Sequence, residues 1–145
     1  MKTGSRHRAR EAALQILYQA EVGGVDPAEA AARHWTIEQD DRRRLAPESQ
    51  AFAGRLAAGT MAHVADIDPL IVQHAQHWRI ERMAVIDRLI LRMAIFELVH
   101  GADTPPSAVI DEAIELARTF SEGEAIRFVN GVLDAVYKSL RPAVP

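Results

Sequence analysis

One segment of the chain, Met83–His100, is apolar around nearly its whole circumference when it is placed on a helical wheel. Its apolar members are Val85, Ile86, Leu89, Ile90, Leu91, Met93, Ala94, Ile95, Phe96 and Leu98. A helix that is hydrophobic on all sides belongs in the middle of a bundle, because no side of it can face water. Its charged side chains are then expected to reach a rim, pair with one another or meet a partner. They are Asp87, Arg88, Arg92 and Glu97.

The rest of the chain is also typical of helices, since no segment alternates apolar and polar residues as a β-strand does. Gly23–Gly24 is expected to end a first helix. Asp26 then caps a second helix that starts at Pro27. A long helix is predicted from about Glu48 to Ala65. The run Asp66–Pro69 should break it, because proline removes a helical hydrogen bond.

Two amphipathic helices are predicted after a turn at Thr104–Pro106. The last of them repeats apolar residues every three or four positions, at Ile126, Val129, Leu133, Val136 and Leu140. Gly131 within it should cost about 1 kcal/mol relative to alanine, so we expect a neighbouring backbone to approach closely there. Taken together, residues 1–145 predict an all-α fold, a single compact domain built as a bundle of about seven helices.

Composition limits the chemistry open to the chain. It has 145 residues, which suits one domain, and no cysteine, which excludes disulfides and thiolate metal or redox sites. Its formal net charge is -3, so attraction to nucleic acid has to come from a local patch. No apolar run is long enough to cross a bilayer and no secretory signal is present, so we expect a cytoplasmic protein without a membrane partner.

A patch of this kind lies at the start of the first helix. The expected core-facing stripe comprises Ala9, Ala13, Ile16, Leu17 and Ala20. The opposite face carries His7, Arg8, Glu11, Gln15, Tyr18 and Gln19, with Arg6 and Arg10 on the border. Cations neutralise phosphates, amides hydrogen-bond to base edges and a ring can stack on an unstacked base. This pattern fits both a plain solvated face and a face that binds RNA or DNA. Cations at a helix N-terminus oppose the helix dipole, which indicates that something other than helix stability favours them there.

Other candidate sites are weaker. The run Asp40–Arg44 contains Arg42, Arg43 and Arg44, which could contact phosphates, but its aspartates can neutralise them. His74 and His77 could share a helix face, yet no third metal ligand is evident. The sequence has neither a phosphate-binding glycine loop nor a nucleophile motif. We therefore expect no metal, no cofactor, no catalytic residues and no enzymatic activity.

Two parts of the sequence resemble the NusB family of bacterial transcription antitermination factors. The first is the opening run from Arg6 to Tyr18. The second is a set of blocks in the family's order and spacing: Leu91–Leu98, Pro105, Val109–Ala117, Phe120 and Arg127–Asp134. The similarity spans nearly the whole chain, whereas the middle part, Gly23–Glu81, matches only as helices.

The resemblance implies an all-helical fold of two small helical halves and a non-enzymatic function. The family binds the boxA element of nascent ribosomal RNA together with NusE, a small-subunit ribosomal protein, and joins the antitermination complex on RNA polymerase. By position, Arg6, Arg8 and Arg10 correspond to the RNA-binding segment, and Tyr18 extends that surface. His7 replaces an arginine common in the family, which implies a weaker or pH-dependent phosphate contact.

The resemblance also assigns the start of the last helix to the RNA surface. Arg127 is expected to meet a phosphate, and Phe128 either stacks on a base or supports the core. Glu124 lies in the same region, although a carboxylate at a helix start is also favoured by the helix dipole. In the first helix, Gln15 and Tyr18 are expected to read unstacked bases.

The surface that faces NusE is implied on the helix holding Asp87 and Arg88, near Glu81, where an acidic side chain suits a basic ribosomal protein. Two alternatives remain open. One is a self-associating protein, such as a homodimer, that keeps the arginine helix covered. The other is the RNA-binding domain found at the front of ribosomal RNA cytosine methyltransferases, which continue into a large cofactor domain, whereas this sequence stops at Pro145.

Overall fold

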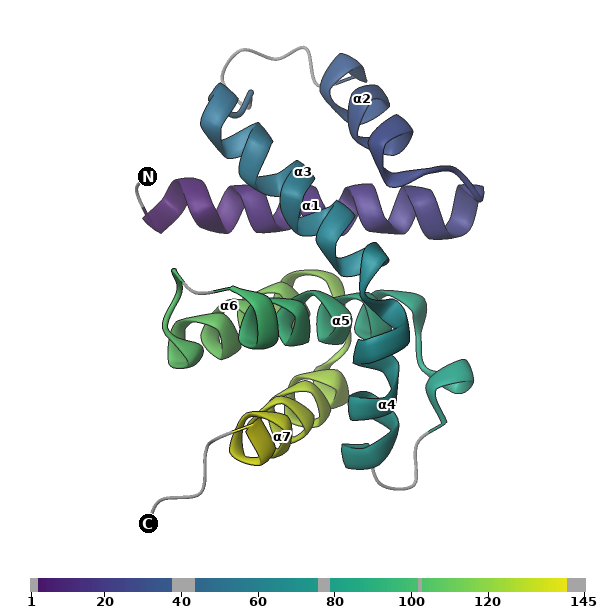
Figure 1. Cartoon of the computed structure of the whole chain (residues 1–145), viewed down its shortest axis with the longest axis vertical. Coiled ribbons are helices and arrows are strands. Elements are labelled where there is room, and N and C mark those ends of the chain that lie inside the picture. The colour runs from purple at the N-terminus through teal and green to yellow at the C-terminus, as the bar shows by residue number, and fades with distance from the viewer. Residues whose placement is uncertain (1–2, 38–43, 76–78, 102, 141–145) are drawn as a thin grey trace. The chain divides into compact units, whose positions relative to one another are not determined.

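The computed structural model describes residues 3–37, 44–75, 79–101 and 103–140. Within these ranges it contains seven α-helices, one short 3-10 helix and no strand, which confirms the all-α prediction (Figure 1). The elements are α1 (Thr3–Gly23), α2 (Pro27–Ile37), α3 (Pro47–Ala62), α4 (Val64–His74), η1 (Ile80–Arg82), α5 (Val85–His100), α6 (Pro106–Phe120) and α7 (Gly123–Leu140). They form two compact units, Met1–Ala62 and His63–Pro145. None of the helices in the described ranges has the length and hydrophobicity needed to cross a membrane.

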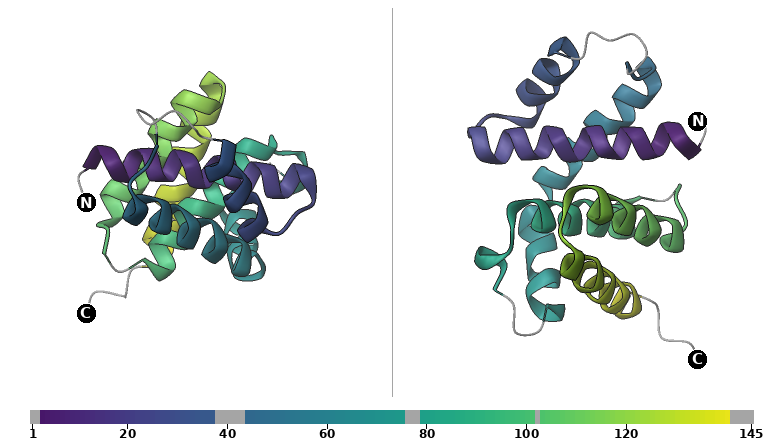
Figure 2. Two further views of the ribbon diagram at one scale, coloured as in Figure 1. Left: turned by 90° about the horizontal axis from the view of Figure 1, so that it is seen from above. Right: turned by 180° about the vertical axis from the view of Figure 1, so that it is seen from behind.

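In the first unit, α1 packs against both α2 and α3, which also contact each other (Figure 2). The predicted core-facing stripe of α1 is buried in full: Ala9, Ala13, Ile16, Leu17 and Ala20. The helix ends at Gly23, and Gly24 adopts a φ of 65°, a left-handed conformation that favours glycine. The predicted cap is confirmed, since the Ala28 N–H donates to Asp26 Oδ1 at 3.3 Å.

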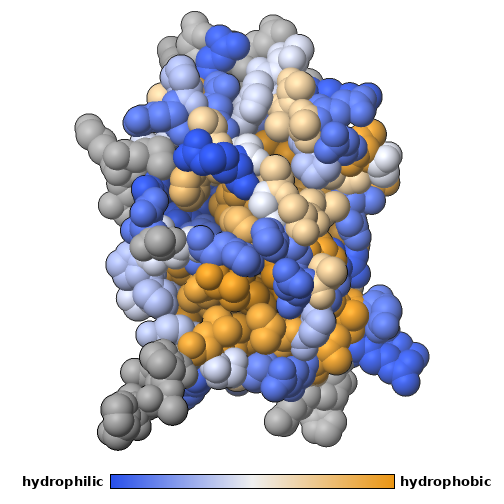
Figure 3. Space-filling view, viewed as in Figure 1, coloured by the Kyte–Doolittle hydropathy of each residue, from blue (hydrophilic) through white to orange (hydrophobic). Residues whose placement is uncertain are grey.

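In the second unit, α5 lies at the centre and contacts α4, α6 and α7. Its buried apolar residues are Leu89, Ile90, Leu91, Met93, Ala94 and Ile95, as expected for a helix that is hydrophobic on all sides. Figure 3 shows hydrophobic residues gathered on one face over the α4–α7 part of the chain. Among the described residues of this unit, the exposed large hydrophobic side chains are Val72, Val99 and Leu140.

One charged side chain of α5 is buried in an ion pair with α4. Arg92 donates from Nε and one terminal nitrogen to both carboxylate oxygens of Asp68, at 2.8 and 2.7 Å. The Arg92 side chain is 10% exposed and that of Asp68 is 26% exposed. This bidentate geometry is the strongest form of a guanidinium–carboxylate contact. It ties the central helix to α4.

The predicted helix break at Asp66–Pro69 is wrong. The chain turns at His63 instead, and Pro69 lies inside α4. The His63 carbonyl accepts hydrogen bonds from the N–H groups of Asp66 and Ile67, which starts the helix before the proline is reached. Pro69 is the sixth of the eleven residues of α4, where its missing N–H removes one helical hydrogen bond. The burial of Ile67 and Ile71 on either side offsets that loss.

The expectation for Gly131 is also wrong. A Cβ built there meets no heavy atom within 4 Å among the described residues, so close packing does not explain the glycine. At Gly101, by contrast, a Cβ would lie 2.7 Å from the carbonyl oxygen of Glu97. Gly101 also ends α5 by donating its N–H to that carbonyl at 2.9 Å, as predicted for a residue that closes this helix.

These two glycines form a matched pair for a stability test. Gly131→Ala should raise the free energy of unfolding by up to about 1 kcal/mol, because alanine favours a helix interior. Gly101→Ala should lower it by about 1–3 kcal/mol, because the new methyl group overlaps backbone. Urea unfolding followed by circular dichroism measures both. A Gly101→Ala protein as stable as the parent would contradict the packing described for the end of α5.

The Arg92–Asp68 pair gives a second test. Asp68→Asn should lower the free energy of unfolding by about 1.5–3 kcal/mol, because a buried guanidinium loses its countercharge. Glu115→Gln is the control, since Glu115 forms an exposed pair with Arg118 at 2.6 Å and should change stability by less than about 1 kcal/mol. Equal effects of the two substitutions, measured in the same urea titration, would show that burial does not strengthen the Arg92 pair.

Candidate nucleic-acid interface

The face of α1 predicted to lie opposite the stripe is exposed at four of its six residues, whereas His7 and Glu11 on it are half-buried. Arg8, Gln15, Tyr18 and Gln19 all lie on the surface of the first unit, and Tyr18 is 43% exposed. This exposure follows from the burial of the apolar stripe, because residues opposite the stripe have to face solvent. A cation, two amides and an aromatic ring are therefore presented along one helix face.

Arg6 and Arg10 share an aromatic partner on α3. Their guanidinium carbons lie 5.2 and 5.3 Å from the centroid of the Phe52 ring, within the range of cation–π attraction. Arg6 is half-buried, whereas Arg10 is only 4% exposed. Arg10 therefore packs behind the exposed face and anchors α1 to α3. No signal in the sequence indicated this pairing.

His7 pairs with the next turn of its own helix. Its Nε2 lies 2.8 Å from a carboxylate oxygen of Glu11, and both side chains are about one-third exposed. The contact becomes an ion pair when the imidazole is protonated. The charge that His7 presents on this face therefore depends on its protonation, and Glu11 lies beside it.

A hollow of about 310 Å³ opens beside the exposed face of α1. It is lined by Arg8, Glu11, Ala12, Gln15, His34, Trp35 and Leu45. The rings of His34 and Trp35 stand perpendicular, with centroids 4.8 Å apart and an angle of 88° between their planes. Sequence reasoning missed these two residues. The only signal for them was an adjacent pair of rings near the end of the second helix.

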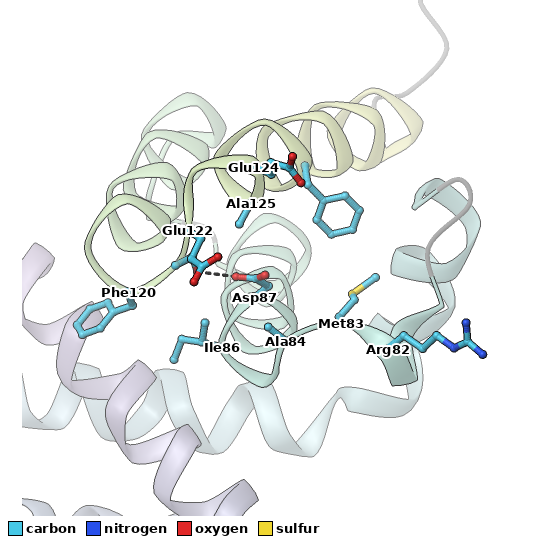
Figure 4. A pocket seen from close by; sticks show the side chains of 11 residues that line it. Arg82, Met83, Ala84, Ile86, Asp87, Phe120, Glu122, Glu124 and Ala125 are labelled. Atoms are coloured by element: carbon cyan, nitrogen blue, oxygen red, sulfur yellow. Dashed lines mark hydrogen bonds between the residues drawn. The ribbon is translucent and has the colours of Figure 1, made fainter.

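A second hollow, of about 390 Å³, lies in the other unit (Figure 4). It is lined by Arg82, Met83, Ala84, Ile86, Asp87, Phe120, Ser121, Glu122, Glu124, Ala125 and Phe128. Ser121 Oγ donates a hydrogen bond to Asp87 Oδ1 and joins the end of α6 to the start of α5. In Figure 4, the Arg82 side chain extends away from Asp87. The hollow combines residues that sequence reasoning divided between an RNA surface and a protein surface.

The residues predicted at the start of α7 differ in exposure. Glu124 and Arg127 are exposed, and Phe128 is half-buried in the wall of the second hollow. Both interpretations of Phe128 therefore stay open: its ring reaches the hollow and also belongs partly to the packed interior.

The residues predicted to face a protein partner also differ in exposure. Glu81 is exposed on η1, and Asp87 is half-buried beside Ser121. Arg88 is half-buried, and its guanidinium donates to the Ile80 carbonyl at 3.5 Å. Of these three residues, Glu81 is the one that is exposed.

The structure describes some of the remaining candidate arginines and histidines. Arg44 is exposed, whereas Arg42 and Arg43 lie outside the described residues, as does His77. His74 Nδ1 lies 2.9 Å from the Leu70 carbonyl of its own helix. Across the described ranges, no three histidine, aspartate or glutamate side chains come together as metal ligands.

Comparison with known proteins relates the sequence to one family. The model of the NusB family matches residues 7–138. The transcription antitermination protein NusB of Symbiobacterium thermophilum is 47% identical over 142 residues, covering 96% of this chain and 93% of the relative. The protein of the same name from Solibacter usitatus is 46% identical over 138 residues, covering 94% and 90%.

Solved structures show the same relationship. NusB of T. maritima superposes with a TM-score of 0.84 at 32% identity, covering 98% of this chain and 96% of that one. A structure of antitermination factors NusB and NusE in complex with double-stranded RNA matches with a TM-score of 0.83 at 26% identity, covering 95% and 99%. The sequence resemblance is thereby confirmed, and the chain belongs to the NusB family.

Proposed function

We propose that this protein is a transcription antitermination factor that binds boxA-type single-stranded RNA in ribosomal leader transcripts together with NusE. The pair then joins the antitermination complex on RNA polymerase in the cytoplasm, and the protein itself catalyses no reaction and needs no cofactor. The names of the relatives support the first part. The structural neighbour that holds NusB, NusE and RNA supports the partnership.

The observation that carries the RNA-binding role is the exposed face of α1. Arg8 is exposed there, and Gln15 and Tyr18 lie along the same face. In an A-form duplex the major groove is too deep and narrow for side chains to read. An amide and a ring therefore suit a single strand, whose bases are unstacked and accessible.

The predicted RNA-binding residues divide into three roles. Arg6, Arg8 and Arg127 contact phosphates, with His7 adding charge when it is protonated. Gln15, Tyr18 and Phe128 contact bases, and Glu124 accepts hydrogen bonds from base amino groups. Arg10 acts through its contact with Phe52, which holds α1 in place beneath the exposed cations.

The charge of the chain sets the strength of binding. With a net charge of -3 and few cations on the interface, affinity for RNA alone should be modest and should fall as salt rises. NusE supplies the additional contacts. Glu81 and Asp87 are the acidic side chains that we assign to this basic partner, with Arg88 supporting the same region through its hydrogen bond to η1.

The RNA surface is tested by charge reversal. Arg6→Glu with Arg8→Glu should weaken binding to a boxA-type RNA and lower the salt slope by about 0.7 for each phosphate that is no longer neutralised. Arg33→Glu with Arg55→Glu is the control, because both arginines are exposed in the same unit and the charge change is equal. Fluorescence anisotropy at several salt concentrations measures both pairs. If the first pair left the affinity and the slope unchanged, the RNA surface would lie elsewhere.

The NusE surface is tested at Asp87. Asp87→Lys should weaken binding of purified NusE more than binding of RNA, because it places a cation against a basic partner. Asp87→Asn is the control, since an amide oxygen can still accept the hydrogen bond from Ser121. Isothermal titration with NusE and with RNA separates the two effects. An Asp87→Lys protein with parental NusE affinity would remove this residue from the interface.

A further inference from the structure

We infer that the hollow between α1 and α2 is a nucleobase subsite that takes one unstacked base of the bound RNA. The inference rests on the proposed function, because it adds α2 to the surface that contacts RNA. The seven lining residues all belong to the first unit. The volume of about 310 Å³ is at the lower end of the range for small-ligand sites, roughly 300–1,000 Å³.

The two rings in the wall match a planar ligand. His34 and Trp35 both line the hollow with their planes perpendicular, so a flat base that stacks on one ring lies perpendicular to the plane of the other. Face-to-face and edge-to-face contacts are the two favourable arrangements of aromatic systems. A single flat base can make both at once.

The polar groups of the hollow favour a base over a phosphate. The Glu11 carboxylate repels a phosphate but accepts hydrogen bonds from the amino group of cytosine, adenine or guanine. Gln15 provides both a donor and an acceptor, so it can pair with a base edge. Arg8 is exposed at the same hollow and supplies the cation for the phosphate of the nucleotide.

The hollow is continuous with the proposed RNA surface, because Arg8 and Gln15 belong to both. A strand whose phosphate contacts Arg8 therefore lies at the hollow that Trp35 lines. This shared lining selects RNA as the occupant rather than an unrelated small molecule.

The test uses the full chain and a boxA-type single-stranded RNA, together with copies of that RNA in which each position in turn is abasic. Trp35→Ala should weaken binding of the intact RNA roughly ten- to hundredfold, since it removes stacking on one base. Trp35→Phe should retain most of the affinity. Gln15→Ala, at an exposed position, should also weaken binding, so the result does not depend on the packing of the indole. Arg33→Ala, on the exposed part of α2 outside the hollow, should leave the affinity unchanged.

One abasic RNA should identify the base. For that RNA alone, the parent and Trp35→Ala should bind equally, because the base that Trp35 contacts is already missing. In a Trp78→Phe background Trp35 is the remaining tryptophan of the two in the chain, and its fluorescence should be quenched by the intact RNA but not by that abasic copy. Anisotropy and tryptophan emission are measured on the same samples.

The outcomes separate the subsite from the RNA-binding role. If Trp35→Ala and Gln15→Ala both bind like the parent while reversal of Arg6 and Arg8 still weakens binding, the subsite and the base contact of Gln15 are wrong, and the proposed RNA-binding role stands. If Trp35→Ala weakens binding of every abasic RNA by the same factor, the indole only supports α1 and the subsite is again wrong. If reversal of the arginines also has no effect, both proposals fail.

Discussion

Burial of the apolar stripe of α1 is the constraint on which the candidate interface depends. Once Ala9, Ala13 and Ile16 pack against α2 and α3, the rotation of α1 about its axis is fixed. Arg8 and Gln15 then have to face water on the same side as Tyr18, because helical geometry places them opposite the stripe. The stacking of nearby arginines on α3 holds the N-terminal end of the helix in the same register. The exposed face is therefore a direct product of core packing.

The second unit shows how one hollow can serve two proposed contacts. Asp87 comes from the start of α5 and Glu124 from the start of α7, and Ser121 connects these regions through its hydrogen bond. A residue that contacts NusE in this hollow would lie beside residues that contact RNA. If the proposed contacts hold, the two partners would be sensitive to each other, because Asp87 and Phe128 line the same hollow.

Much of the fold could be predicted because helix periodicity and end signals are local. The central position of Met83–His100 and the cap at Asp26 both follow from a few neighbouring residues. The break at Pro69 was misplaced because a proline inside a helix can remove one hydrogen bond without ending the helix, when the residues around it are buried. The helical wheel also predicted the exposed positions Arg8, Gln15, Tyr18 and Gln19 of α1 correctly. The wheel could not predict that Trp35 lines a hollow beside α1 or that Arg10 is buried, because both depend on which helices pack together.

The stacking of Arg10 on Phe52 has a consequence for genetic studies of this protein. Arg10 resembles its neighbours in sequence, yet it is nearly inaccessible to solvent. A screen for loss of antitermination would therefore recover Arg10 and Arg8 substitutions alike, for different reasons. Those at Arg8 would leave a normal amount of folded protein in the cell. Those at Arg10 would reduce its abundance, because a misplaced first helix exposes the hydrophobic interior to proteases.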